Sequence, residues 1–177
     1  MTSDDGTIDL AELVRDIPDF PKAGILFRDI MPLLQDPQAL RQTVDDLATY
    51  ADDKDIDVVF GAEARGFILG AAIAYRLEAG FVCARKPGKL PWHTVKAEYD
   101  LEYGTDSLEV HSDAITPGMR VLVHDDLLAT GGTAKAKCEL VERLGGTVAG
   151  VAFIIELTAL GGRKKLEGYD VFSLITY

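Results

Sequence analysis

The chain is poor in cysteine and has no long apolar run. Only two of its 177 residues are cysteines, Cys83 and Cys138, and a compact domain of this size does not need a disulfide, so we expect buried free thiols. No apolar run approaches the roughly 20 residues that a membrane-spanning helix needs. The start, Met1 to Gly6, is polar and acidic, unlike a signal peptide. We therefore expect a cytoplasmic protein without membrane contact.

Basic residues are also scarce, with 18 lysines and arginines against 29 aspartates and glutamates and a formal charge of −11. A nucleic-acid surface needs a basic stripe, so this balance argues against a nucleic-acid partner. Much of the acidity serves solubility. An acidic chain that binds phosphate must nevertheless gather its cations locally or recruit a metal ion.

Several common motifs are missing as well. No cysteine or histidine pair has the spacing of a structural zinc site. There is no Gly-x-x-x-x-Gly-Lys-Ser/Thr string, and no Gly-x-Gly-x-x-Gly follows the first expected strand. The sequence therefore gives little support to a nucleotide triphosphatase or a dehydrogenase.

What is present indicates one globular α/β domain over residues 1–177, because 47% of the residues are apolar and strand-like runs alternate with helical ones. The predicted helices are Ile8–Ile17, a helix capped by Asp36 that begins at Pro37 and ends near Asp52, Gly66–Glu78 and Thr133–Leu144. The predicted strands are Ile56–Gly61, Gly80–Ala84, Ser107–His111, a strand from Arg120, Thr147–Leu157 and Tyr169–Tyr177. This order predicts a mostly parallel central sheet flanked by helices, with ligands at the carboxyl ends of the strands.

Two segments show no clear helical or strand periodicity of their apolar residues. Asp19–Ile30 is expected to be an ordered loop that follows an N-terminal extension of residues 1–18. Lys86–Thr105 contains prolines, glycines and mixed charge, and an irregular stretch of this length in a compact domain is typical of a functional lid. We expect a flexible lid over residues 86–105.

The most informative segment is Val121–Thr133. An apolar strand leads to Asp125 and Asp126, and a Thr/Gly-rich loop then opens directly into a helix. A helix N-terminus offers unpaired amides and the positive end of a dipole, and glycines let an anion approach the backbone. Carboxylates suit sugar hydroxyls, as in dinucleotide sites. A phosphate beside a ribose diol describes a ribose 5-phosphate, whereas a glycine turn with helix caps would explain only the Gly-Gly-Thr part.

This ordered string resembles the signature of the type I phosphoribosyltransferases. The resemblance implies that Asp125 and Asp126 contact the ribose 2′ and 3′ hydroxyls, and that the 5-phosphate is held by Ala129, Thr130, Gly131, Gly132 and Thr133. His124 stands where an aliphatic residue is more usual, and a satisfied strand histidine is the simpler interpretation. Further matching strings are Asp19–Ile30, Arg65–Phe67, Arg85–Pro91, Leu101–Gly104, Glu156–Thr158, Gly162–Arg163 and Phe172–Leu174.

Within the family the chain is most similar to the members that accept adenine. The implied reaction converts adenine and phosphoribosyl diphosphate into AMP and diphosphate with Mg²⁺, a purine-salvage step, in a homodimer. Diphosphate would meet the loop Ala62–Gly66, including Ala64 and Arg65, and the cations Arg85, Lys86 and Lys89. Other members can carry Asp-Ser in place of Glu63-Ala64, so any hydroxyl contribution at Ala64 is absent.

The resemblance also implies roles in base recognition and proton transfer. Glu102 is the candidate for proton transfer at the adenine ring, Tyr103 for closing over the donor, and Arg65 for a catalytic cation. Leu26, Phe27, Arg28 and Leu157 are the candidates for the base. Phe27 could equally be a core residue and Glu102 one more exposed acid.

Two other functions are compatible with parts of this pattern. A relative that accepts a 6-oxopurine usually needs a lysine near the final strands, and Lys164 and Lys165 lie elsewhere, after Gly161 and Gly162. A non-catalytic ligand sensor would need an added DNA-binding domain or a basic face. An assay with each purine base separates these possibilities.

Overall fold

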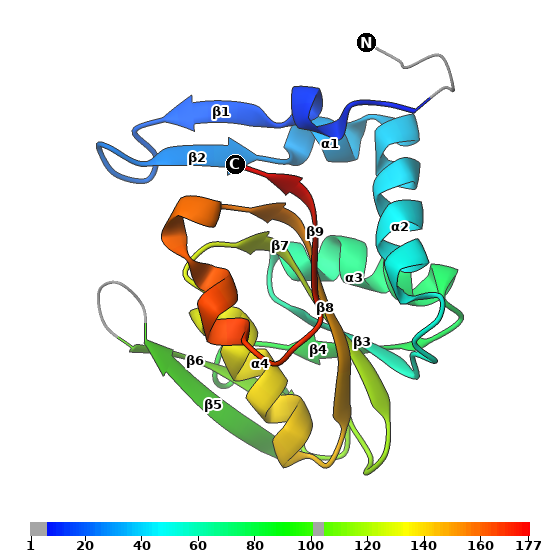
Figure 1. Cartoon of the computed structure of the whole chain (residues 1–177). Helices are drawn as coiled ribbons and strands as arrows, with labels where there is room; N and C mark the ends of the chain where they lie inside the picture. The colour runs from blue at the N-terminus through cyan, green and yellow to red at the C-terminus, as the bar shows by residue number, and fades with distance from the viewer. Residues whose placement is uncertain (1–6, 101–104) are drawn as a thin grey trace. The chain divides into compact units, whose positions relative to one another are not determined.

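The structure, a computed structural model, describes residues 7–100 and 105–177. It divides into two compact units, residues 1–46 and 47–177, each described here by itself. Figure 1 draws the chain from blue at its N-terminus to red at its C-terminus.

The N-terminal unit contains a short two-stranded antiparallel sheet. A 3₁₀ helix, η1 (Leu10–Leu13), precedes strand β1 (Arg15–Pro18), which pairs with β2 (Leu26–Asp29). The prediction of a helix over Ile8–Ile17 is therefore wrong beyond one short turn, and the prediction of a loop over Asp19–Ile30 is wrong for its last third. Pairing between β1 and β2 decides both segments, and local periodicity does not report such pairing.

Two helices follow in this part of the chain, α1 (Met31–Gln35) and α2 (Pro37–Ala51). The Oδ1 atom of Asp36 accepts hydrogen bonds from the backbone N–H groups of Gln38 at 2.9 Å and Ala39 at 2.8 Å. The predicted cap is confirmed, because Asp36 satisfies amides of the first turn that have no partner within the helix. Helix α2 runs from the first unit into the second.

The C-terminal unit is built on a five-stranded parallel sheet in the order β4-β3-β7-β8-β9. Its elements are β3 (Val58–Ala62), α3 (Arg65–Arg76), β4 (Gly80–Ala84), β7 (Arg120–Leu128), α4 (Gly132–Arg143), β8 (Thr147–Glu156), the 3₁₀ helices η2 (Thr158–Leu160) and η3 (Gly162–Leu166), and β9 (Val171–Thr176). The predicted parallel α/β sheet flanked by helices is confirmed, with α3 and α4 on opposite sides of the sheet (Figure 1).

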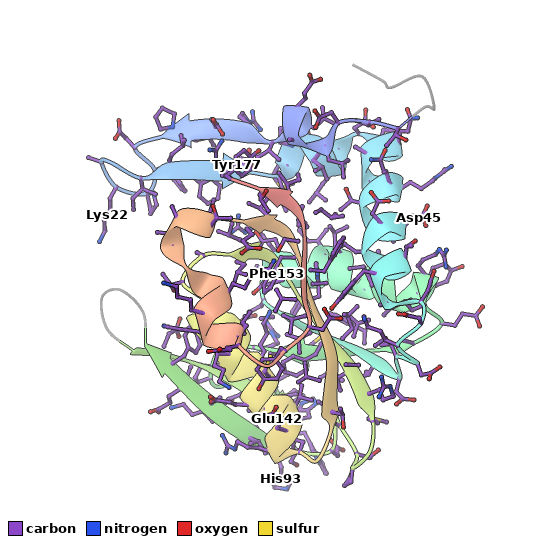
Figure 2. All side chains as sticks on the ribbon, viewed as in Figure 1. Lys22, Asp45, His93, Glu142, Phe153 and Tyr177 are labelled. Atoms are coloured by element: carbon purple, nitrogen blue, oxygen red, sulfur yellow. The ribbon has the colours of Figure 1, made fainter. Side chains whose placement is uncertain are left out.

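Side chains of the sheet alternate between its two faces. Phe60, Val121, Val123 and Phe153 belong to the buried cluster that includes the α4 residues Ala134, Leu140 and Val141. Figure 2 shows Phe153 surrounded by other side chains, whereas Glu142 near the end of α4 lies at the periphery. Residues that alternate with these along the strands have side chains on the other face of the sheet, which α3 covers. The alternation therefore decides which of the two helices can contact a given side chain at the end of a strand.

A β-hairpin, β5 (Thr94–Asp100) with β6 (Thr105–His111), forms a separate two-stranded sheet. The sequence predicted no regular structure for Thr94–Asp100, so that part of the prediction is wrong. The reason is again pairing, since Thr94 to Asp100 run antiparallel to His111 to Thr105. Residues 101–104 lie outside the described part of the chain.

The remaining composition-based expectations concern cysteines and membranes. Both cysteines are free thiols; Cys138 is buried and Cys83 is half-buried. No helix in the described residues is long and apolar enough to cross a membrane.

Candidate active site

A cavity of about 280 Å³ lies where the loops after β3 and β7 meet. Its wall contains Ala64 and Arg65 at the start of α3, and the stretch Asp125 to Ala134 that leads into α4. The first residues of two helices therefore face one cavity. Each helix N-terminus contributes free amides and positive potential, so the cavity is suited to a ligand with two anionic groups.

The loop Ala129–Thr133 has the shape expected of a phosphate cradle. Gly131 adopts φ +80°, a left-handed conformation that favours glycine, directly before α4. The loop also rests on the backbone of Gly162: a Cβ at Gly131 would overlap the Gly162 carbonyl oxygen, and a Cβ at Gly162 would overlap the Ala129 carbonyl oxygen. Glycine is needed at both positions because two backbones meet without space for a side chain.

The segment that carries Gly162 is held by a buried carboxylate. Oε1 of Glu156, at the end of β8, accepts a hydrogen bond from Nε of Arg163 at 3.0 Å, and its Oε2 accepts one from Oγ of Ser173 at 2.8 Å. The hydrogen bond from Arg163 holds the pKa of Glu156 below its usual range. This network fixes the backbone next to Gly162 and so supports the cradle.

Asp125 and Asp126 extend from opposite faces of β7, and each meets a cation from the helix on its own side. Nζ of Lys137, on α4, lies 2.9 Å from Oδ2 of Asp125. Nε of Arg65, the first residue of α3, lies 3.1 Å from Oδ2 of Asp126. Both carboxylates also line the cavity. The site thus contains two adjacent acids, each paired with one base.

The two carboxylates differ in their proton affinity. Burial and the neighbouring Asp125 charge raise the pKa of Asp126 to about 7, although the Arg65 guanidinium opposes this shift. Burial also disfavours ionisation of Asp125, but the charge and hydrogen bond of Lys137, together with the neighbouring His124 and Asp126, outweigh it and hold the pKa of Asp125 below its usual range. At neutral pH Asp125 is therefore an anion, while Asp126 can share a proton.

Sequence reasoning missed Lys137. Its side chain is fully buried, and its Nζ also donates to the carbonyl oxygen of His124 at 2.7 Å. The spacing of apolar residues in the sequence could have identified it. Lys137 falls on the face of α4 that also carries Ala134, Leu140 and Val141, and the helical period assigns that face to the core. A lysine on such a face requires a buried partner.

His124 is a buried strand residue, as the simpler interpretation held, but only one of its two ring nitrogens is satisfied in the described residues. Its Nδ1 donates to the carbonyl oxygen of Ala152 at 3.0 Å, and its Nε2 is buried without a hydrogen-bond partner in the described residues. Burial lowers the pKa of His124 to about 4. The imidazole is neutral at pH 7, and Asp125 follows it directly on the strand.

The loop after β3 is tied to the loop after β4 by Glu63. Oε2 of Glu63 accepts a hydrogen bond from Nε of Arg85, and Oε1 accepts one from the backbone N–H of Lys86, both at 2.8 Å. The peptide bond between Glu63 and Ala64 is cis. Arg85 is thereby placed beside the loop of Arg65, although Arg85 and the exposed Lys89 line a separate cavity with Phe81, Cys83 and His111.

Lys86 reaches the edge of the cavity through the hairpin. Its Nζ pairs with Asp106 and lies 3.5 Å from the hydroxyl of Tyr99, which also donates to Asp106 at 3.2 Å. Tyr99 lines the cavity and interacts with the hydroxyl of Thr133. Sequence reasoning missed Tyr99, because it treated this strand as irregular.

Of the expected site residues in the C-terminal unit, four do not line this cavity in the described part of the chain: Arg85, Lys86, Lys89 and Leu157. Glu102 and Tyr103 lie outside the described residues. Leu26, Phe27 and Arg28 lie on β2 of the N-terminal unit, where Phe27 contacts Phe20 edge-to-face at 5.2 Å and Arg28 pairs with Asp16. Leu157 follows β8 and donates its N–H to Leu128.

A cavity at the carboxyl edge of a parallel sheet, with two acids beside a glycine-rich loop, is the arrangement that the sequence predicted for a phosphorylated sugar. Residues 33–176 match the family described as "Phosphoribosyl transferase domain". A Rubrobacter xylanophilus protein named adenine phosphoribosyltransferase is 62% identical over 165 residues, which cover 93% of this chain and 89% of that protein.

Solved structures of adenine phosphoribosyltransferases are also similar to this chain. The crystal structure of adenine phosphoribosyltransferase from Thermoanaerobacter pseudethanolicus has a TM-score of 0.93 and 54% identity, covering 96% of this chain and 98% of that one. The Saccharomyces cerevisiae enzyme, crystallised with adenine and an imino-altritol bisphosphate, has a TM-score of 0.89 and 40% identity over 94% of this chain and 96% of that one. The chain belongs to the phosphoribosyltransferase family and, within it, to the adenine phosphoribosyltransferases.

Proposed function

We propose that the cavity is where this chain transfers the 5-phosphoribosyl group from phosphoribosyl diphosphate to adenine, forming AMP and diphosphate in purine salvage. One observation carries the proposal: two adjacent carboxylates and a glycine cradle share one cavity with the Arg65 loop. That combination matches a ligand with a diol between two phosphate groups, in a chain that belongs to the adenine phosphoribosyltransferases.

The cradle and the two acids would bind different parts of the donor, the 5-phosphate and the ribose hydroxyls. Ala129, Thr130, Gly131, Gly132 and Thr133 bind the 5-phosphate through amides and hydroxyls at the start of α4. Asp125 and Asp126 accept hydrogen bonds from the 2′ and 3′ hydroxyls. Asp125 is the stronger acceptor of the two because it is an anion at neutral pH.

Diphosphate would leave toward the loop after β3. As the bond from C1′ to the diphosphate oxygen breaks, the sugar carbon gains cationic character and the leaving group gains charge. Ala64 and Arg65 belong to that loop and line the cavity, which supports this direction for the leaving group. Arg85, Lys86 and Lys89 would supply further positive charge, since the Glu63 and Asp106 contacts hold Arg85 and Lys86 beside the loop.

The proposal includes Mg²⁺, which binds to oxygen ligands and is commonly held through substrate phosphates. The cavity fits such an ion, because its described wall presents carboxylate and hydroxyl oxygens. The donor's diphosphate and ribose oxygens would hold it, and we assign it no protein ligand. When bound, it neutralises charge on the leaving group.

The assignments for the base rest on the family. Leu26, Phe27 and Arg28 would contact adenine by stacking and hydrogen bonding, and Leu157 would pack against it. Glu102 would take part in proton transfer as the ring nitrogen bonds to C1′, and Tyr103 would close over the donor. The lid over residues 86–105 would exclude water, which could otherwise attack the sugar carbon.

We further propose that residues 1–177 act as one phosphoribosyltransferase domain in a cytoplasmic homodimer. Light scattering at micromolar concentration tests the dimer. A mass near 38 kDa, twice the 19.2 kDa of the chain, supports it, and a monomer mass contradicts it.

The reaction is tested by incubating the protein with phosphoribosyl diphosphate, Mg²⁺ and each purine base in turn, and by quantifying nucleotide and diphosphate. AMP from adenine alone is the expected result. IMP or GMP instead would contradict the base assignment, and donor binding without any product would favour a ligand sensor.

A further inference from the structure

Lys137 is a fully buried lysine whose ammonium donates hydrogen bonds to β7. Its Nζ lies 2.7 Å from the carbonyl oxygen of His124 and 2.9 Å from Oδ2 of Asp125. On α4 the cavity wall ends at Ala134, so Lys137 approaches Asp125 from behind. A buried charge is costly unless it is paired, and this one is paired with a residue that we assign to the ribose.

Asp125 is held from several sides. Its Oδ1 accepts a hydrogen bond from the N–H of Asp126 at 3.0 Å, and its Oδ2 accepts the bond from Lys137. The start of α3 also packs against it, because a Cβ at Gly66 would lie 2.9 Å from Oδ1. The carboxylate therefore has one orientation, and each oxygen keeps lone pairs for further donors.

The charged groups around Asp125 balance. Asp126 and the neutral His124 flank it on β7, Lys137 reaches it from α4, and Arg65 from the start of α3 pairs with Asp126. With every group ionised, the two acids and two bases sum to zero formal charge. Without Lys137, Asp125 would lose the cation that is paired with it beside a site for two phosphate groups.

We infer that Lys137 is a positioning residue for the donor: it holds Asp125 in place and cancels its charge, so that this acidic pair can bind a sugar carrying phosphates. The inference rests on the proposed function and names a residue that acts through Asp125 without touching the substrate. In this chain a lysine behind the strand thus allows two adjacent carboxylates to remain beside anions.

The main test replaces Lys137 by methionine, which keeps an unbranched, flexible side chain of similar volume and removes its charge. Donor affinity should fall about tenfold or more, since coupling within a buried charge network is of that order. Donor KM should rise while kcat changes much less, because Lys137 does not touch the reacting atoms. The matched control is Lys135→Met, on the same helix, whose Nζ lies near Tyr169 and Glu139 instead. The control should stay within about twofold of the unmodified chain.

The pH dependence distinguishes positioning from a purely structural role. Lys137 favours the ionised form of Asp125, so its removal should shift the midpoint of donor affinity against pH upward, with affinity lost as the pH falls. Lys135→Met should leave the midpoint unchanged. Calorimetry with phosphoribosyl diphosphate between pH 5.5 and 8.5 measures this midpoint.

A double-mutant cycle tests whether the effect passes through Asp125. In an Asp125→Asn background, Lys137→Met should cost little further donor affinity. Equal losses in both backgrounds, or unchanged donor affinity and pH midpoint in a folded Lys137→Met variant, would overturn the inference. These are binding measurements without adenine, so they remain valid even if the chain forms no AMP.

A further measurement applies if Lys137→Met does not fold. In the unmodified protein, carbon-13 NMR of the aspartate carboxyl groups, with Asp125 assigned through Asp125→Asn, should show Asp125 titrating below the ordinary aspartate range. Lys137→Gln offers a second variant that keeps hydrogen-bonding capacity without charge. An Asp125 that titrates in or above the ordinary range contradicts the inference.

Discussion

Nε of Arg65 lies 3.1 Å from Oδ2 of Asp126, so an ion pair joins the start of α3 to the end of β7 across the cavity wall. Arg65 is the first residue of α3, and Asp126 lies two residues before the end of β7. The pair holds the guanidinium of Arg65 at the cavity wall, and a planar guanidinium can donate to more than one oxygen at once.

We predict that Arg65→Lys lowers kcat/KM by about 10- to 100-fold. Lysine keeps the charge but loses the planar fork that can bind Asp126 and a diphosphate oxygen together. Steady-state kinetics with varied phosphoribosyl diphosphate measures the loss. Arg76→Lys, at the opposite end of the same helix, is the control and should retain kcat/KM.

Asp126 should make stability depend on pH. Its pKa is raised from 3.8 to about 7 in the folded chain, so the folded state retains a proton that the unfolded state releases. The stabilisation from that proton is complete below about pH 4 and is lost as the pH rises through about 7. Relative to Asp126→Asn, the unmodified chain should therefore lose about 2 to 4 kcal/mol of unfolding free energy between pH 4 and pH 8.

Urea unfolding of both proteins without ligand at these two pH values measures the difference. A constant difference would show that Asp126 does not take up a proton on folding. The acidic pair would then be two ordinary carboxylates.

Gly131→Ala should damage the cradle. A Cβ there would overlap the carbonyl oxygen of Gly162, so the loop must move, at a cost of about 1 to 3 kcal/mol of stability. Donor affinity should fall because the 5-phosphate amides lose their alignment. Gly168→Ala is the matched control: Gly168 also has positive φ, +93°, but a Cβ there meets nothing within 4 Å. Equal effects of both variants on donor affinity would contradict the packing argument.

Glu102→Gln should lower turnover more than donor affinity, because a proton-transfer group acts in the transition state. Single-turnover kinetics and donor calorimetry separate the two quantities. Glu98→Gln removes an exposed carboxylate from the neighbouring strand β5 and should keep normal turnover. Wild-type turnover in Glu102→Gln would leave Glu102 without a catalytic role.

Chelation of divalent metal should abolish AMP formation, and added Mg²⁺ should restore it, since the leaving diphosphate needs charge neutralisation. The control is the melting temperature in excess chelator, which should not change if the ion arrives with the donor. Full activity in excess chelator would contradict the magnesium proposal.

Sequence reasoning succeeded where the deciding chemistry is local. The Asp36 cap, the apolar runs of the central strands and the order of acids, cradle and helix after Val121 each depend on neighbouring residues. It failed for β1, β2 and β5, whose conformations depend on antiparallel partners. Because β5 was not predicted, Tyr99 was not predicted as a site residue, although it lines the cavity.

The sequence by itself determined the parallel α/β fold, the glycine-rich loop before α4 and the two carboxylates beside it, because spacing along the chain suffices to place them at one strand end. Only the tertiary structure decided that Lys137 pairs with Asp125 and Arg65 with Asp126. Those pairs form between residues 12 and 61 positions apart, since successive side chains of β7 face opposite helices. Burial strengthens the effect of each ion pair on the pKa of its carboxylate, because a buried carboxylate stays ionised only when a cation lies close to it.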